Sequence, residues 1–205
     1  RVFAFDISDK AKPCIQWVHN GDRAFRTSTG YGVRKDGVPI VMVGDIGGWT
    51  SAIDARNGNR LWITKTGLYD ASTSTATPVL VGDNVIAPSS QYEIMMAGQD
   101  HHVCCKLHGG VSAVDAVTGK IVWQTGTMPD AKPIRDRGDG QMLWGPAGAP
   151  VWNSPSIDLK RNRIYFGTGE ANSAPAHPNT DALMSIDLTS GKILWSHQAT
   201  ENDVF

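Results

Sequence analysis

Short stretches rich in β-branched and aromatic residues follow one another along the chain, and each is bounded by Gly, Asp, Asn or Pro. The clearest example is residues 111–115 and 121–123, whose composition favours β-strands. Between them, Asp115 can accept backbone N–H groups in an Asx-type turn, and Gly119 tolerates the positive φ that such a turn needs. The pattern predicts a β-hairpin ending at Trp123, with the large ring buried and the indole N–H in need of a hydrogen-bond partner.

This hairpin pattern occurs four times, and a Trp ends each copy. The copies span residues 4–17, 52–62, 113–123 and 185–195, and the first is a looser match with three extra turn residues. Their Trp residues stand at positions 17, 62, 123 and 195, so successive copies are 45, 61 and 72 residues apart. A period that starts near 45 residues and grows by loop insertion is typical of a β-propeller with one blade per repeat. We expect the repeated Trp to pack between neighbouring blades.

A second hairpin precedes each of the three later copies, at residues 33–44, 78–88 and 155–167. Two hairpins per repeat give four strands per blade, as in propellers. The sequence therefore predicts an all-β fold, a partial β-propeller of about three and a half four-stranded blades in one domain. Its expected divisions are residues 1–17 as the outer hairpin of one blade, 18–62, 63–123 and 124–195 as successive blades, and 196–205 as the start of the next connection.

The number of blades is smaller than in a closed ring, because propellers have roughly four to eight. The chain also begins inside a predicted strand at residues 1–6 and ends at residues 202–205, in a loop that should lead to another blade. We therefore expect the chain to be a fragment of a longer polypeptide. Such a fragment would form an open arc with apolar blade faces exposed where the missing neighbours should pack.

Composition and charge exclude some partners. The net charge is −1, so nothing favours binding to nucleic acid or to an anionic membrane surface. No run of about 18 apolar residues is present, so no transmembrane helix is expected, and no signal peptide is visible. Two long insertions, residues 91–103 and 128–150, carry Gly, Pro, Met and charged residues without strand alternation. Long insertions of this kind tend to lie on a functional face.

Two of the three cysteines, Cys104 and Cys105, are adjacent. Ordinary disulfides join Cα atoms about 4.4–6.8 Å apart. Neighbouring Cα atoms lie about 3.8 Å apart, or about 2.9 Å apart across a cis peptide bond. The pair is therefore either a strained ring, which persists only where its surroundings enforce it, or two buried free thiols.

Three histidines near the cysteine pair, at positions 101, 102 and 108, raise the alternative of a zinc site. Adjacent Cys-Cys and His-His pairs do not match the spacing of structural zinc ligands. Side chains one residue apart on a strand also point to opposite faces, so they rarely bind one ion. The sequence therefore disfavours zinc.

Several ordered features of the chain resemble the pyrroloquinoline quinone (PQQ) dependent alcohol dehydrogenases. They are the repeat Ala-x-Asp-x-x-Thr-Gly-Lys-x-x-Trp, the Cys104-Cys105 pair, and the Ile-Tyr-Phe-Gly-Thr-Gly segment at residues 164–169. Segments 89–93, 104–109, 144–152 and 200–203 resemble in particular the polyvinyl alcohol dehydrogenase branch. The resemblance covers nearly the whole chain. It implies an eight-bladed propeller with the quinone and a calcium ion on the central axis.

The resemblance also implies roles for individual residues at the quinone. Cys104 and Cys105 would form a vicinal disulfide that lies flat against one face of the quinone, which leaves Cys14 free or paired outside this chain. Trp144 would offer an aromatic face to the quinone, whereas for Trp152 a place in the core is at least as well supported. Arg26 would pair with a quinone carboxylate, although a solvated edge Arg needs no function.

Two glutamates are the implied metal ligands. Glu93 stands where the resembling enzymes offer a carboxylate to calcium, which prefers hard oxygen ligands. Glu170 replaces the Asn ligand of many relatives and departs from the family pattern in that respect. Both are expected to face the central axis and to bind one calcium ion. The alternative for either glutamate is a solvated loop carboxylate.

No residue of this chain is expected to be the general base. In the resembling enzymes, a run similar to residues 200–205 is followed at once by the acidic residue proposed for that role, and here it would follow Phe205. The resemblance thus implies a fragment of a periplasmic or secreted PQQ- and calcium-dependent dehydrogenase, inactive by itself. The whole enzyme would oxidise a secondary or polymeric alcohol, similar to polyvinyl alcohol, by hydride transfer to the quinone. A cytochrome c-type protein or another acceptor would then take the electrons.

Two other functions remain as alternatives. The first is a non-catalytic quinoprotein-like propeller acting as a protein-assembly scaffold, in which the Trp repeats serve packing only. Such a scaffold has no need for a strained Cys-Cys pair, for Glu93 in its Ser-Ser-x-x-Glu loop, or for the insertion between Trp144 and Trp152. The second is a sugar-binding or hydrolytic propeller, for which the sequence shows no convergent pair of carboxylates.

Overall fold

The computed structural model describes residues 1–97, 99 and 102–204. The described residues form an all-β structure with one short helix, α1 (Glu93–Ala97), and this confirms the predicted fold class. No helix in these ranges is long and apolar enough to cross a membrane.

Three antiparallel sheets correspond to three blades. The first has the strand order β3 (Gly30–Val33), β4 (Pro39–Gly44), β5 (Trp49–Asp54), β6 (Arg60–Lys65). The second has β11 (Ile121–Gly126), β10 (Gly110–Asp115) and β9 (Asn84–Gln91), and both β7 (Ser72–Thr73) and β8 (Val79–Val81) pair with β9. The third has β14 (Ser156–Asp158), β15 (Arg163–Gly167), β16 (Ala182–Asp187), β17 (Ile193–Gln198). The predicted inner and outer hairpins are therefore present in all three sheets. The exact blade divisions stay a prediction.

Two further hairpins complete the described strands. The hairpin of β1 (Val2–Asp6) and β2 (Cys14–His19) is the looser N-terminal copy of the repeat. The hairpin of β12 (Lys132–Asp136) and β13 (Met142–Gly145) lies in an insertion for which the sequence predicted no strands, and that prediction was wrong. All five residues of β12 are exposed, so this hairpin has no buried face to produce hydrophobic alternation.

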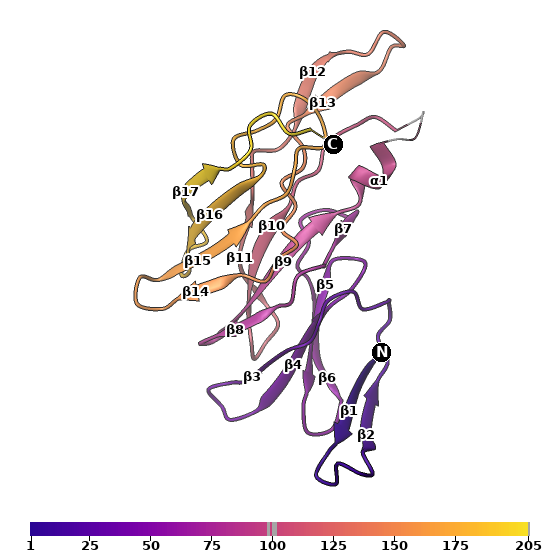
Figure 1. Cartoon of the computed structure of the whole chain (residues 1–205), viewed down its shortest axis with the longest axis vertical. Coiled ribbons are helices and arrows are strands. Elements are labelled where there is room, and N and C mark those ends of the chain that lie inside the picture. The colour runs from indigo at the N-terminus through magenta and orange to yellow at the C-terminus, as the bar shows by residue number, and fades with distance from the viewer. Residues whose placement is uncertain (98, 100–101, 205) are drawn as a thin grey trace.

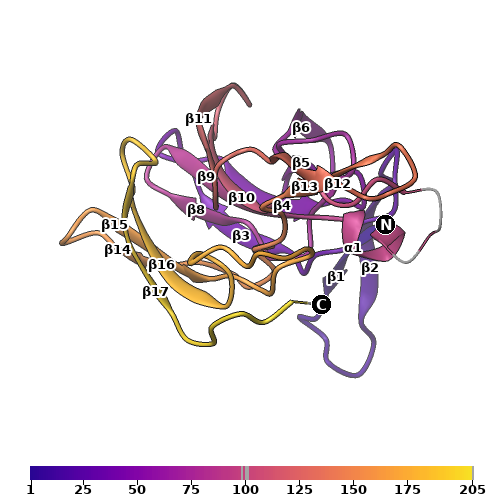
Figure 2. The same ribbon diagram turned by 90° about the horizontal axis from the view of Figure 1, so that it is seen from above.

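The sheets follow one another as an open arc in chain order, from the β1–β2 hairpin at one end to the β14–β17 sheet at the other (Figure 1). Viewed from above, the three sheets splay apart like blades (Figure 2). Buried aliphatic side chains fill the space between them. Ile40 and Met42 of the first sheet pack with Val85 and Val114 of the second. A larger cluster joins the second sheet to the third, and its members include Ile86, Val111, Ile164, Phe166 and Met184.

Three of the four repeated Trp residues, Trp17, Trp62 and Trp123, pack between blades, as predicted. The indole N–H of Trp62 donates to the carbonyl of Ala116 in the Asp-to-Gly turn of the next blade, at 2.9 Å. The ring also covers Gly119, where an added Cβ would come within 2.8 Å of the Trp62 side chain. Trp17 and Trp123 repeat both contacts, with Ala55 and Gly58 and with Leu188 and Gly191 respectively. The same local motif therefore packs the Trp of one hairpin against the turn of the next blade along the chain.

Candidate functional site

The long connections of the propeller gather at one end of the sheets. Neighbouring strands in each sheet run in opposite directions. The connection between the second and third strands therefore lies at the same end of the sheet as the connection from the fourth strand to the next sheet. We call this the loop end; it carries residues 20–29, 45–48, 66–71, 92–97, 102–109, 127–155 and 168–181. The turns that lead from Asp to Gly in each repeat, at residues 54–58, 115–119 and 187–191, lie at the opposite end of the sheets, which we call the turn end. Helix α1, the β12–β13 hairpin and the C-terminus all lie at the loop end (Figure 1).

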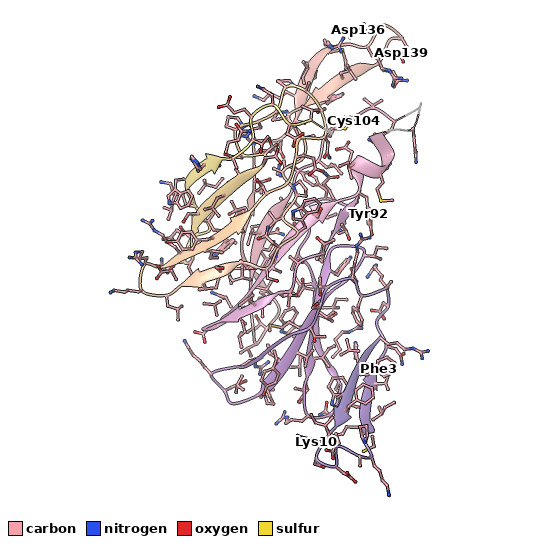
Figure 3. All side chains as sticks on the ribbon, viewed as in Figure 1. Phe3, Lys10, Tyr92, Cys104, Asp136 and Asp139 are labelled. Carbon is pink, nitrogen blue, oxygen red and sulfur yellow. A yellow bond between two sulfur atoms is a disulfide. The ribbon has the colours of Figure 1, made fainter. Side chains whose placement is uncertain are left out.

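A cavity of about 150 Å³ opens at the loop end, and we call it the Arg26 cavity. Arg26, Trp152 and Glu170 all line it, although they come from three different sheets or their connections. The guanidinium of Arg26 donates to the Tyr92 hydroxyl at 3.1 Å and lies 5.6 Å from the centre of that ring. Tyr92 and Cys104 both lie toward this end of the molecule, far from Phe3 and Lys10 of the N-terminal hairpin (Figure 3).

Two hydroxyl groups in the Arg26 cavity lack partners. Oγ1 of Thr73 and Oγ1 of Thr75 are buried, and neither has a hydrogen-bond partner among the described residues. A buried polar group without a partner is costly, so native proteins rarely keep one without a ligand or water to satisfy it. These two hydroxyl groups are enclosed in the cavity wall, so Arg26 is the group that the cavity presents to an anionic ligand.

Trp152 does not lie in the core, which was one of the two places that the sequence left open for it. The residue is 55% exposed and forms part of the cavity wall. It lies four residues before β14, outside the strands, so strand alternation does not bury it. Gly169 makes room for its ring, because an added Cβ would lie 3.3 Å from Cζ2 of Trp152.

The Cys104–Cys105 pair forms a vicinal disulfide across a cis peptide bond, which confirms the prediction and excludes two free thiols. Cys14 is free and exposed. The backbone of Trp144 forms a hydrogen bond with each cysteine. The Trp144 N–H donates to the Cys104 carbonyl at 3.2 Å, and the Trp144 carbonyl accepts from the Cys105 N–H at 3.3 Å. Cys104 and Trp144 also share a second cavity of about 190 Å³, which contains neither Arg26 nor Glu170.

Asn172 adjoins the disulfide on another side. Its carbonyl oxygen lies 3.7 Å from the Cys104 sulfur and 3.5 Å from the Cys105 sulfur. Its side-chain amide is 5% exposed, and neither amide atom has a hydrogen-bond partner among the described residues. Asn172 could not be selected from its sequence position, since its environment depends on the fold around the disulfide.

The two glutamates differ in environment. Glu170 lines the Arg26 cavity. Glu93 is 2% exposed, and its carboxylate accepts the backbone N–H groups of Lys106 and Leu107 and approaches the His102 ring at 3.2 Å. Among the described residues, no group of three or more His, Cys, Asp or Glu side chains is arranged to hold a metal ion. The calcium-ligand roles of Glu93 and Glu170 stay a prediction.

The zinc alternative gains no support from the described histidines. His102 contacts Glu93, and His108 lies 2.6 Å from the Tyr69 hydroxyl, in another cavity of about 470 Å³ that Asp130 also lines. Burial and the nearby Asp130 carboxylate raise the pKa of Tyr69, so this phenol stays protonated. His101 lies outside the described residues.

Asp181 adds negative charge near Glu170. Burial, then the charges of Asp203 and Glu170, raise the pKa of the Asp181 carboxyl group. Its Oδ2 atom is buried without a hydrogen-bond partner among the described residues, and its φ is 49°. The negative charges of Asp203 and Glu170 thus make it harder for Asp181 to lose its proton. Sequence analysis missed Asp181, because only the fold brings it close to Glu170 and Asp203.

Comparison with protein families gives a match over most of the chain. Residues 52–205 match the family described as PQQ glucose/ethanol/alcohol dehydrogenase, β-propeller domain. A polyvinylalcohol dehydrogenase of Pseudomonas sp. is 31% identical over 194 residues, which cover 93% of this chain and 30% of the relative. A second, from Sphingopyxis sp. strain 113P3, is 30% identical with the same coverage. The chain therefore spans about 30% of the length of the curated relatives it matches first.

Solved structures have the same fold. A europium-containing methanol dehydrogenase superposes with a TM-score of 0.73 at 20% identity, covering 98% of this chain and 38% of that one. The quinohemoprotein alcohol dehydrogenase ADHIIG from Pseudomonas putida HK5 gives a TM-score of 0.62 at 25% identity, covering 81% of this chain and 26% of that one.

Proposed function

The chain belongs to the PQQ glucose/ethanol/alcohol dehydrogenase β-propeller family, and on this basis we propose that it forms part of a quinone-dependent dehydrogenase that oxidises a secondary or polymeric alcohol. The observation that carries the proposal is the Arg26 cavity at the loop end, which Arg26, Trp152 and Glu170 line together. The polyvinylalcohol dehydrogenase names of two relatives support a polymeric alcohol as substrate.

The residues of the loop end fit a planar, anionic quinone. Arg26 is positioned on the Tyr92 ring, where its guanidinium can pair with a carboxylate. The exposed Trp152 ring offers a flat apolar surface that excludes water from one face of a bound ring system. The disulfide and Trp144 offer a second such surface beside Asn172.

A cation belongs to the same proposal. Glu170, with Asp181 and Asp203 near it, creates the negative potential that attracts calcium or another hard cation, and Glu93 is the second proposed ligand. The carboxylate oxygens of these residues are the donor type that such ions require. When bound, the quinone supplies two-electron oxidation chemistry, and the cation supplies Lewis acidity. This chain's own residues bind and orient both groups.

The partners and the location of the protein follow from the relatives and are proposed on that basis. One relative is named methanol dehydrogenase [cytochrome c] subunit 1 and others are quinohemoproteins, which supports a cytochrome c-type electron acceptor. We place the protein in the periplasm or outside the cell, where a disulfide such as Cys104–Cys105 persists. The dehydrogenase relatives and the vicinal disulfide favour this function over an assembly scaffold.

Titration of the protein with PQQ, with and without calcium, tests the proposal. Arg26→Ala should weaken quinone binding about tenfold, because Arg26 is exposed and its charge-assisted hydrogen bond to a carboxylate should contribute about 1.5 kcal/mol, the low end of the usual range. Arg161→Ala is the matched control, since Arg161 pairs with Asp158 at the turn end. Equal affinities for both variants and the unmodified protein would show that the Arg26 cavity does not hold the quinone.

A further inference from the structure

Glu93 is buried beside the cysteine pair, and its carboxylate is hydrogen-bonded to groups of the protein itself. It is the first residue of α1, and its side chain is almost fully enclosed, with 2% of the residue exposed. Its own backbone N–H donates to Oε1 of Gln91 at 2.5 Å, which fixes the start of the helix. A carboxylate this deeply buried needs hydrogen-bond donors, and the cysteine loop provides them.

The donors lie on both sides of the disulfide. Oε2 of Glu93 accepts the N–H of Lys106 at 2.7 Å and the N–H of Leu107 at 2.6 Å, directly after Cys105 in the chain. Oε1 lies 3.2 Å from Nε2 of His102, two residues before Cys104. A single side chain thus holds both ends of the cysteine loop, residues 102–107.

The cysteine loop also contacts Trp144 and Asn172. The Trp144 backbone pairs with both cysteines, the Lys106 ammonium lies 4.1 Å from the centre of the Trp144 ring, and the Asn172 carbonyl lies against both sulfurs. Charge-assisted hydrogen bonds are stronger than the neutral hydrogen bonds of the Trp144 backbone, and Glu93 makes two of them to adjacent N–H groups. We propose that Glu93 is a positioning residue that holds the Cys104–Cys105 disulfide in place at the loop end, before any metal or quinone binds.

This role is compatible with the proposed metal role, on which it does not depend. An ionised carboxylate has about four lone-pair positions, and the contacts to Lys106, Leu107 and His102 use three of them. One position therefore remains for a further ligand. The inference rests on the proposed function only in treating the disulfide as part of the quinone site.

Reduction of the disulfide by dithiothreitol measures how firmly the loop is held. A dithiothreitol thiolate attacks a sulfur of the pair, the S–S bond breaks, and the second dithiothreitol thiol closes to give oxidised dithiothreitol and two cysteine thiols. Cys105 is fully buried whereas Cys104 lines a cavity, so attack is expected at Cys104. Loosening the loop should expose both sulfurs and speed this reaction.

The experiment compares three variants without quinone or added metal, with alkylation and mass spectrometry counting the new thiols. Glu93→Ala should be reduced about tenfold faster than the unmodified protein, since loss of one charge-assisted hydrogen bond is worth about that factor. Glu93→Gln keeps one acceptor oxygen for Lys106 and Leu107 and should fall between the two. Glu170→Gln removes the other proposed metal ligand and should stay within about twofold of the unmodified rate.

Hydrogen exchange at the Lys106 and Leu107 amides is the second readout, and it should accelerate in the Glu93 variants only. If Glu93→Ala does not fold, Glu93→Gln decides: faster reduction supports the proposal, and an unmodified rate with unchanged exchange overturns it. Equal acceleration in Glu170→Gln would also overturn it, by showing a general loosening of the loop end. Because no quinone is present, failure of quinone binding leaves the result of this test unaffected.

Discussion

Replacing Trp62 by Phe should destabilise the protein by about 2 kcal/mol, because this Trp joins two blades. The substitution removes the indole N–H that donates to the Ala116 carbonyl, which costs about 1 kcal/mol. The smaller ring leaves space above Gly119, which costs about 1 kcal/mol more. The Ala116 carbonyl keeps Nη1 of Arg34 as a partner at 3.3 Å, so no penalty for an unsatisfied acceptor is added.

Trp195→Phe is the matched control, because Trp195 ends the same repeat but is 36% exposed. In the described part of the chain no sheet follows β17, so this Trp has no next blade to join. Its replacement should cost less than about 0.5 kcal/mol, as is usual for surface positions. Urea unfolding followed by circular dichroism measures both values. Equal costs for the two variants, or a neutral Trp62→Phe, would refute the blade-joining role of this Trp.

Three further predictions concern the loop end. Alkylation before reduction should label Cys14 alone, and alkylation after reduction should label all three cysteines; labelling of Cys104 or Cys105 in the unreduced protein would contradict the disulfide. The raised pKa of the Asp181 carboxyl group means that the folded protein binds this proton more tightly than the unfolded chain, so stability is lost as pH rises through the folded pKa. Asp181→Asn should therefore raise the melting temperature at pH 7 and have little effect near pH 3.5. A larger effect near pH 3.5 than at pH 7 would show that burial of the Asp181 carboxyl group does not raise its pKa. Dye-linked alcohol oxidation by the 205-residue chain with PQQ and calcium should be absent, because the chain spans only about 30% of the length of the dehydrogenases it matches, and measurable turnover would contradict this prediction.

The sequence predicted those parts of the fold that depend on local pattern. Asp115, Gly119 and Trp123 lie within one hairpin, so their spacing alone revealed the turn, the strands and the repeat. The β12–β13 hairpin was missed for the opposite reason, since its strands have no consistently buried face. Adjacent cysteines are also local, which is why the disulfide could be expected from the family resemblance.

The candidate site was harder to predict, because its residues meet only in the folded chain. Trp152 lies beside Gly169 of the next long connection, where an added Cβ would come within 3.3 Å of Cζ2 of the ring. Asp181 became notable only when the fold placed it near Glu170 and Asp203. The sequence pointed to Glu93 as a metal ligand, but not to its contacts with residues 13 and 14 positions further along the chain.

Hydrogen–deuterium exchange with and without PQQ and calcium tests the central claim most directly, since it locates the quinone on the molecule. The account predicts protection at the loop end, in residues 69–75, 90–95, 102–107 and 144–152. It predicts no protection in the Asp-to-Gly turns at residues 54–58, 115–119 and 187–191. Protection confined to those turns, or none at saturating quinone, would contradict the assignment of the loop end as the quinone site.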